Sequence, residues 1–514
     1  MKFYSKSIFY LLLFAFSFPV LTAQPVVKTK DGLVKGMTTG SGVHVFKGIP
    51  FASPPIGDLR WKAPQPAKKW TGIKDCLAFG PSPMQSTPVP FMFWSKEFLI
   101  PETPISEDCL YLNVWSGAKS WNEKRPVLMY IYGGGFRSGG AGCPIYDGEN
   151  ISKKGVVFVS INYRVGIFGF LSHPELSAES TSKTSGNYAL LDMIAALKWI
   201  RKNIASFGGD PNNVTIAGQS AGSFAVNALT ACPLAKGLFH KAIAESGAMM
   251  HDNPLRTNMS LKDAEKIGAD YAGSMKCNSI KDLRAKTSEE IQKSLGGVSA
   301  PIIDGYVLPD KVSSMYTLKK IKPVPALIGW NGDDKVANRA VEDQMFQEQL
   351  NKKFGVLAMD IRRAYHIDMN QPTDQAQFDM GRDETFGSQM YAWANIQSSL
   401  NPASLFMYNF NRHIPAYSKA TEYGAFHSGE IVYAYNNLQT FDRPWTEVDR
   451  HIADVMSSYW ANFCKTGSPN GKDLPQWKVY DQRNHQVMVI GDDNIRSTEL
   501  PTLDKMMVWE KYFK

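Results

Sequence analysis

The 514-residue sequence lacks the features that mark several common classes of protein. It has no dense run of lysine or arginine, and a formal net charge of +8 is small for this length, so we expect no nucleic-acid partner. It contains only six cysteines, none of them in a CxxC pair, and no Cys/His cluster that suggests a metal site. It also has no internal repeat and no low-complexity tract. These absences leave a globular chain whose stability must come from a large apolar core.

The first 23 residues have the composition of a secretory signal. Lys2 and Lys6 form a basic start, residues 8–18 are almost all apolar, and Ala23 precedes Gln24. The apolar stretch is too short to span a bilayer as a mature helix, and no second stretch is long enough. We therefore expect residues 1–23 to be cleaved and the mature chain to be secreted or periplasmic without a membrane span. An uncleaved membrane anchor is the alternative interpretation.

Short apolar runs alternate with helical patterns along most of the chain. The sequence predicts strands at residues 127–132, 156–161, 214–217, 325–328 and 405–408. It predicts helices at residues 187–207 and 451–463. Such alternation favours an α/β fold with a large, mostly parallel central sheet and helices on both faces. Residues 256–295 are rich in charge and helix formers, which indicates a helical insertion. No linker divides the chain, so we expect residues 24–514 to form a single domain.

A Gly-x-Ser-x-Gly motif, Gly218 to Gly222, lies between a predicted strand and a predicted helix. In this context the motif forms a sharp turn that exposes the serine hydroxyl above a sheet. The N-terminus of the following helix favours the negative charge that develops during attack on a carbonyl. We therefore predict that Ser220 is a catalytic nucleophile, although the bare motif also occurs in ordinary glycine-rich turns.

A second glycine-rich segment, Gly133 to Gly135, directly follows the strand predicted at residues 127–132. A tetrahedral oxyanion needs backbone N–H donors that no side chain obstructs, and glycine allows that close approach. The amides of Gly134, Gly135 and Ala221 are candidates for a three-donor oxyanion hole. Taken alone, the glycine run also fits a loop with positive φ angles, but its combination with the serine motif favours the catalytic interpretation.

A serine nucleophile needs a base, and the base needs an acid that orients it. Among nine histidines the best candidate is His427, which lies in a loop of small residues well after Ser220. Asp333 and Asp334 follow a predicted strand and precede His427, which gives the chain order serine, acid, histidine. The residues alone leave both aspartates open. Ser246 follows another strand pattern but lacks the first glycine of the motif, so we expect it to have a structural role near the site.

Several long motifs, in the same order, resemble those of the type B carboxylesterase/lipase family of cholinesterase-like α/β-hydrolases, closest in character to bacterial secreted carboxylesterases. They are Gly48-Ile-Pro-Phe-Ala52 with Leu59-Arg-Trp61, Ser106 to Val114, Asn162-Tyr-Arg164, and Phe207 to Gly222. The resemblance spans nearly the whole mature chain. It implies the α/β-hydrolase fold and a serine esterase in which Ser220 is the nucleophile, His427 is the base, and the three amides above form the oxyanion hole.

The resemblance also bears on the cysteines and the acid. It implies a disulfide between Cys76 and Cys109, which stand at the positions of the family's first disulfide. The pairing of the other four cysteines stays open (Cys143, Cys232, Cys277, Cys464). The family usually has Glu at the acid position, and alignment of this loop puts Asp334 there, so we expect Asp334 rather than Asp333 to be the acid. Adjacent residues of an extended loop point to opposite sides, so only one of the two should face His427.

Two departures from the cholinesterases disfavour choline esters. Gln219 stands where those enzymes have Glu before the nucleophile, and Trp94 is out of register with their choline-stacking tryptophan. A cationic substrate would need that carboxylate and that aromatic face.

The expected reaction is transfer of an acyl group from a small-molecule ester to Ser220 and then to water, without a metal or organic cofactor. The sequence names neither the natural ester nor the oligomeric state. A triglyceride, a carbamate or a plant phenolic ester is the alternative substrate within the family. The alternative outside enzymes is an inactive binding or adhesion homologue, against which Ser220, His427 and the glycine run argue.

Overall fold

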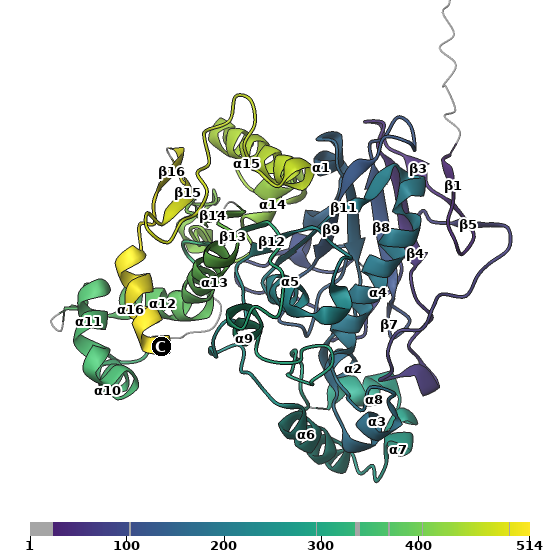
Figure 1. Ribbon diagram of the computed structural model, residues 1–514, viewed down its shortest axis with the longest axis horizontal. Coiled ribbons are helices and arrows are strands. Elements are labelled where there is room, and N and C mark those ends of the chain that lie inside the picture. The colour runs from purple at the N-terminus through teal and green to yellow at the C-terminus, as the bar shows by residue number, and fades with distance from the viewer. Residues whose placement is uncertain are drawn as a thin grey trace, which may run out of the picture.

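The centre of the molecule is a sheet of eleven strands, which Figure 1 shows in the middle of the ribbon. The computed structural model describes residues 24–101, 104–294, 296–334, 340–368, 371–402, 404–492 and 494–514. The predicted signal at residues 1–23 lies outside the described residues. The strand order is β16-β15-β14-β13-β12-β11-β9-β10-β8-β4-β3.

Seven neighbouring strands are parallel, as the alternation of strands and helices predicted. They are β9 (Arg125–Ile131), β10 (Val157–Ile161), β11 (Gly209–Gln219), β12 (Lys241–Glu245), β13 (Ala326–Asn331), β14 (Leu405–Phe410) and β15 (Gln486–Ile490). Every residue of β10, β12, β13 and β14 is buried, because helices cover both faces of a parallel sheet. The predicted strands therefore appear as short continuous apolar runs.

Antiparallel strands close the two edges of this sheet. They are β8 (Tyr111–Ser116), β4 (His44–Pro50) and β3 (Met37–Thr38) at one edge and β16 (Ile495–Glu499) at the other. Two small sheets lie outside it, formed by β1 (Val26–Lys28), β2 (Leu33–Lys35) and β5 (Ile73–Asp75), and by β6 (Ser82–Pro83) with β7 (Ile105–Ser106).

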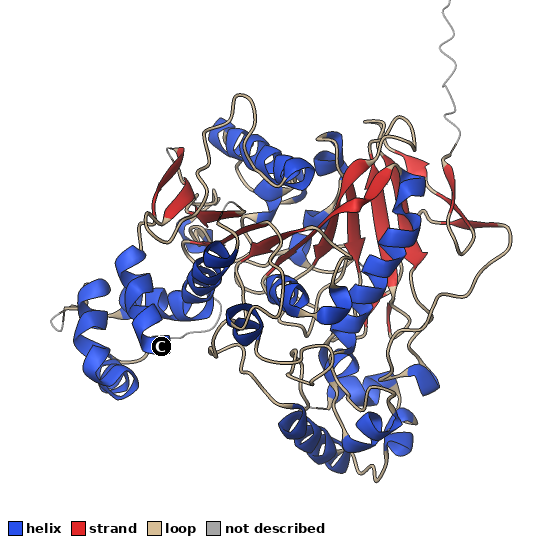
Figure 2. Cartoon of the chain, in the orientation of Figure 1, coloured by secondary structure: helices blue, strands red, loops and turns tan. Residues whose placement is uncertain are grey.

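Helices pack around the sheet, and Figure 2 shows them in blue on both of its sides. Those that contact the parallel strands include α4 (Tyr188–Asn203), α5 (Ala221–Ala231), α13 (Ser388–Leu400) and α15 (Glu447–Thr466). The helix predicted at residues 187–207 is shorter, because a 3₁₀ turn (Ile204–Phe207) replaces its last residues. The helix predicted at residues 451–463 is longer, because Thr446 and Asp449 form a capping box and Gly467 ends it with φ 82°.

Two helical regions flank the sheet. The predicted insertion contains α6 (Leu261–Ser274), α7 (Ile280–Arg284) and α8 (Ser288–Lys293), which share a small apolar core around Tyr271 and Leu283. The second region, on the left of Figure 1, consists of α10 (Asp343–Phe354), α11 (Ala358–Ala364), α12 (Asp374–Arg382) and α16 (Leu503–Phe513). The remaining short helices are α1 (Glu149–Lys153), α2 (Gly166–Phe170), α3 (Pro174–Glu179), α9 (Val312–Thr317) and α14 (Ile431–Ala434).

Cys76 and Cys109 are both buried free thiols in the structure, which does not contain the predicted disulfide between them. The two residues lie in different surroundings: the backbone of Cys76 bonds to Lys35 and Lys47, whereas Cys109 is close enough to the ion pair of Arg164 and Asp192 to interact with its charges. Burial raises the pKa of the Cys76 thiol to about 12, so the thiol stays protonated. The other four cysteines are also buried and free. Among the described residues, no helix is long and apolar enough to cross a membrane.

Candidate active site

The predicted site residues follow neighbouring strands at the carboxyl edge of the sheet. β11 lies between β9 and β12, and Gly218 pairs with both Ile131 and Ala244. The loops that follow these parallel strands must therefore lie side by side, as they do at ligand sites of other α/β sheets. The next strand, β13, leads into the loop that carries Asp333 and Asp334.

Ser220 occupies a strained turn between β11 and α5. Its φ of 55° and ψ of −122° lie outside the regions that residues with a side chain normally adopt. Two backbone hydrogen bonds hold it there: its N–H donates to Glu245 O at 2.8 Å, and its carbonyl accepts from Phe224 N at 2.9 Å. A Cβ at position 222 would lie 2.0 Å from the Ile131 carbonyl oxygen, so only glycine fits. The Gly-x-Ser-x-Gly sequence is thus required by this turn.

His427 is held by Asp334. The His427 Nδ1 atom lies 2.7 Å from Asp334 Oδ1, and the two side chains are 2% and 0% exposed. Asp334 Oδ2 accepts two further hydrogen bonds, from Ser246 Oγ at 2.7 Å and from the Asn331 N–H at 2.9 Å. Because Nδ1 faces a carboxylate, we infer that it carries the ring proton and that Nε2 is unprotonated. Asp334 can therefore fix both the orientation and the tautomer of the ring.

Asp333 points elsewhere. Its Oδ2 accepts from the Ala425 N–H at 2.9 Å and lies 4.0 Å from His413 Nε2. The structure thus brings Asp334, and not Asp333, against His427.

Gln219, the residue before Ser220, contacts the imidazole of His427. Its Nε2 lies 3.3 Å from His427 Nε2 and 3.5 Å from His427 Nδ1, and its Oε1 accepts from Ser428 Oγ at 3.1 Å. An amide N–H can donate to an unprotonated ring nitrogen, so glutamine suits the neutral form of His427. In the sequence, Gln219 is recognisable only as a departure from the cholinesterases, and no pattern predicts this contact.

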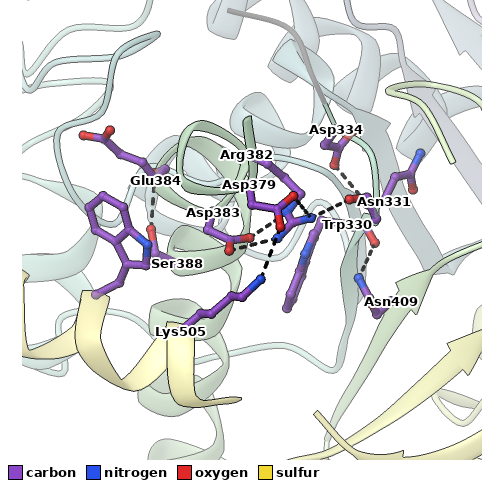
Figure 3. Close-up of polar contacts among 12 residues, drawn as sticks. Trp330, Asn331, Asp334, Asp379, Arg382, Asp383, Glu384, Ser388, Asn409 and Lys505 are labelled. Carbon is purple, nitrogen blue, oxygen red and sulfur yellow. Dashed lines mark hydrogen bonds and ion pairs between the residues drawn. The ribbon is translucent and has the colours of Figure 1, made fainter. Parts of the chain in front are cut away.

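A π-helical segment and the residue before it supply two more groups that support the site. It spans Asp383–Gly387, between α12 and α13, and such segments are frequent at functional sites. Its Phe386 ring stacks on the His427 ring at 4.9 Å with an angle of 22°. Just before it, Arg382 pairs with Asp383 at 2.7 Å and donates to the Gly332 carbonyl at 2.6 Å. Figure 3 shows this ionic cluster beside Asn331 and Asp334.

Two buried glutamates lie behind the acid. Glu245 Oε1 accepts from Trp460 Nε1 at 2.7 Å, and Asn331 donates to Glu430, while each glutamate has one oxygen without a partner. Burial raises the pKa of Glu245 to about 8; burial and the charges of Glu245 and Asp334 raise the pKa of Glu430 well above its usual range. Burial therefore favours the protonated form of both carboxyls.

A cavity of about 680 Å³ opens onto Ser220 and His427. Its wall includes Gly134, Gly135 and apolar side chains of the segment between Val89 and Ile100. In the part of the chain that the structure describes, Arg137 is the only permanently charged residue in this wall. Nor do three His, Cys, Asp or Glu side chains gather anywhere in that part as they would around a metal ion.

The chain matches the family model described as the carboxylesterase family over residues 23–509. It belongs to this family. The fumonisin B1 esterase of Sphingopyxis macrogoltabida is 33% identical over 90% of this chain and 86% of its own length. The para-nitrobenzyl esterase of Bacillus subtilis is 32% identical over 91% and 95%. The solved structure of the Geobacillus stearothermophilus carboxylesterase covers 94% of this chain and 99% of its own, with a TM-score of 0.80 and 30% identity. The family resemblance and the α/β-hydrolase fold are thereby confirmed, and the carboxylesterase is a serine-type hydrolase of carboxylic esters.

The sequence predicted the site residues that belong to a local motif and did not predict the others. Glu430 lies three residues after His427, and its position in a buried apolar stretch was the available signal. Phe386 and Arg382 are some forty residues earlier in the chain, in a helical region without any motif. Ser246 lies near the site as expected, where it hydrogen-bonds to Asp334.

Proposed function

We propose that this carboxylesterase acts through a triad of Ser220, His427 and Asp334. The observation that carries the proposal is the buried 2.7 Å contact between His427 and Asp334, beside a serine held in a strained turn. In the proposed reaction, His427 Nε2 takes the Ser220 proton as Oγ attacks the ester carbonyl carbon. The intermediate collapses, the alcohol leaves with the proton from His427, and an acyl-enzyme remains. Water, deprotonated by the same nitrogen, releases the acid and restores Ser220.

Gly134, Gly135 and Ala221 are the proposed oxyanion hole. Gly134 and Gly135 have φ angles of 106° and 65°, which glycine adopts without strain. A Cβ at Gly134 would lie 2.2 Å from the Ser138 carbonyl oxygen, so the loop cannot accept a side chain there. The Ala221 amide stands at the start of α5, where helix N–H groups are free to bind a negative oxygen.

We further propose that the mature enzyme is exported after cleavage between Ala23 and Gln24 and acts on a small-molecule ester. The order of basic, apolar and small residues at the N-terminus supports export. Mass spectrometry of the mature chain is expected to find Gln24 first, and retention of Lys2 would refute cleavage. A lipase, carbamate or phenolic-ester activity remains the alternative, which a panel of esters of different acyl and alcohol size resolves.

Labelling with a fluorophosphonate probe tests the triad. The wild-type enzyme is expected to carry the probe on the peptide that contains Ser220, and Ser220→Ala is expected to remain unlabelled and to lose at least about 10⁴-fold in kcat. Ser399→Ala changes an exposed serine on α13 and serves as the control. An unlabelled wild-type enzyme would instead support an inactive binding homologue.

A further inference from the structure

Two arginines lie beside the oxyanion loop with most of their donors unused. Arg137 lines the cavity, and its Nε donates to Ser299 Oγ at 2.9 Å. The Arg256 guanidinium lies 5.0 Å from the Phe136 ring centre and 5.2 Å from that of Phe224. Arg256 donates one side-chain hydrogen bond, to the Leu255 carbonyl, and its buried Nε has no partner. A guanidinium has five N–H donors, so each of these arginines retains enough to bind another group.

Arg137 is exposed and Arg256 is half-buried. The buried arginines of the described chain, Arg60, Arg164 and Arg382, differ from them because each pairs with a carboxylate. Arg164 pairs with Asp192 at 2.7 Å, and Arg382 pairs with Asp383 at the same distance. No described carboxylate lies within ion-pair distance of Arg137 or Arg256. Burial and repulsion by Arg137 lower the pKa of Arg256 to about 10, which still leaves it charged at neutral pH. A partly buried cation without a counter-ion is unfavourable, and an incoming anion would relieve that cost.

The position of the pair identifies the part of the substrate it faces. In the proposed reaction His427 protonates the leaving alcohol, so the alcohol part lies on the His427 side of Ser220. Phe136 directly follows Gly135 of the proposed oxyanion hole, and Phe224 lies in the first turn of α5. Arg256 contacts both rings, so it lies beside these two elements of the proposed oxyanion hole, and Arg137 lines the cavity there. We place the acyl part of the ester on this side, away from His427.

We propose that Arg137 and Arg256 form an anion subsite that binds a carboxylate on the acyl part of the substrate. This rests on the proposed triad and names the substrate class: hemi-esters of short dicarboxylic acids. A guanidinium binds a carboxylate through two parallel hydrogen bonds, which orients the acyl chain as well as attracting it. On the other side, the Trp94 ring lies edge-on to His427 with 6.3 Å between ring centres, and Phe91 stacks on Trp94. The alcohol part of the substrate is accordingly apolar.

The test compares three ethyl esters of similar length: ethyl hydrogen glutarate, ethyl 4-nitrobutanoate and ethyl 4-(trimethylammonio)butanoate. The nitro group has the shape of a carboxylate without its net charge. For the wild-type enzyme, kcat/KM is expected to be at least tenfold higher for the glutarate than for the nitro ester, and lowest for the cationic ester. The preference is expected to decrease in high salt.

Arg137→Gln is expected to reduce the ratio of kcat/KM between the anionic and the nitro ester about tenfold, mainly through KM for the anionic ester. Arg256→Gln, whose folding is checked by thermal unfolding, is expected to change the ratio in the same direction. Arg483→Gln removes an exposed charge that pairs with Asp481 and is the matched control, with an unchanged ratio.

The outcomes separate this proposal from the triad. Turnover of the nitro ester without a preference for the glutarate, or a preference that Arg137→Gln leaves intact, would overturn the anion subsite while the esterase mechanism stands. If the wild-type enzyme hydrolyses none of the three esters and takes no fluorophosphonate, the triad fails and the subsite fails with it.

Discussion

The two sides of Ser220 differ in how completely their polar groups are paired. On the histidine side, Asp334 accepts three hydrogen bonds, from His427, Ser246 and Asn331. On the oxyanion side, Arg137 and Arg256 each donate a single side-chain hydrogen bond. Groups that must keep one geometry through the reaction are saturated by protein donors, which fixes them before the substrate arrives. Groups that keep unused donors are the ones available to a ligand.

The largest effect is expected from a change on the saturated side. Asp334→Asn keeps the size of the side chain but replaces one oxygen by an N–H donor, so His427 is held in the wrong tautomer. We expect kcat to fall by about 10⁴-fold with little change in fold. The measurement is steady-state hydrolysis of a neutral ester together with circular dichroism.

Asp333→Asn is the matched control, because it makes the same chemical change at the adjacent residue. Asp333 contacts the Ala425 backbone and not His427, so we expect less than about a tenfold loss in kcat. Loss of turnover in Asp333→Asn with retention in Asp334→Asn would reverse the assignment of the acid.

The second prediction compares a paired with an unpaired arginine. Arg164→Met leaves Asp192 buried without a counter-ion, and we expect a loss of about 3–5 kcal/mol in the free energy of unfolding. Arg256→Met removes a cation that has no carboxylate partner, and we expect a change of less than about 1 kcal/mol, in either direction. Urea unfolding measures both. Equal losses would mean that Arg256 is as fully compensated as Arg164 and has no donors left for a ligand.

The sequence predicted the parts of this site that depend on local geometry. The sharp turn at Ser220 leaves no room for a side chain at Gly222, so the motif by itself indicated the turn. The choice of Asp334 came from alignment with the family's acid position. The alternation of side chains in an extended loop implied only that one of the two aspartates would face His427, and in the structure they have different partners. Phe386 lies in a π-helical segment between two α-helices and stacks on His427, and no local pattern specifies that contact.

The predicted disulfide, which the structure does not contain, had a different basis. It rested on the family positions of Cys76 and Cys109, not on any property of their neighbours. The pairing of two thiols depends on the distance between loops that are far apart in the sequence, and a residue pattern does not contain that distance.

The third prediction concerns the protonated glutamate behind Asp334. The pKa of Glu245 is raised to about 8 in the folded protein, from an ordinary value near 4.5. Between these values the folded state holds a proton that the unfolded state has released, so stability falls as pH rises and levels off above the folded pKa. One such proton lowers the free energy of unfolding by about 1.4 kcal/mol for each pH unit, or by about 2 kcal/mol between about pH 6 and 7.5.

Glu245→Gln removes this contribution and keeps an oxygen that accepts the Trp460 N–H. We expect the variant to lose less stability than the wild-type enzyme over the same pH range, with the difference measured by urea unfolding at each pH. Parallel curves for the two proteins would mean that Glu245 is ionised in the folded state.

The smallest predicted effect comes from Gln219, which lies between the two sides. Gln219→Glu puts a carboxylate where an amide now lies 3.3 Å from His427 Nε2. The added charge stabilises the imidazolium form of His427. Because the proposed base acts only when it is unprotonated, we expect the acidic limb of the variant's kcat/KM profile to lie about one pH unit higher. Activity on a neutral ester is then expected to be lower in the variant at the acidic end of the profile, with little change at the alkaline end. Gln292→Glu is the matched control, since Gln292 lines the same cavity but donates to Ser86. A smaller shift is expected there; equal shifts in both variants would show that the charge acts through the cavity as a whole and not through its contact with His427.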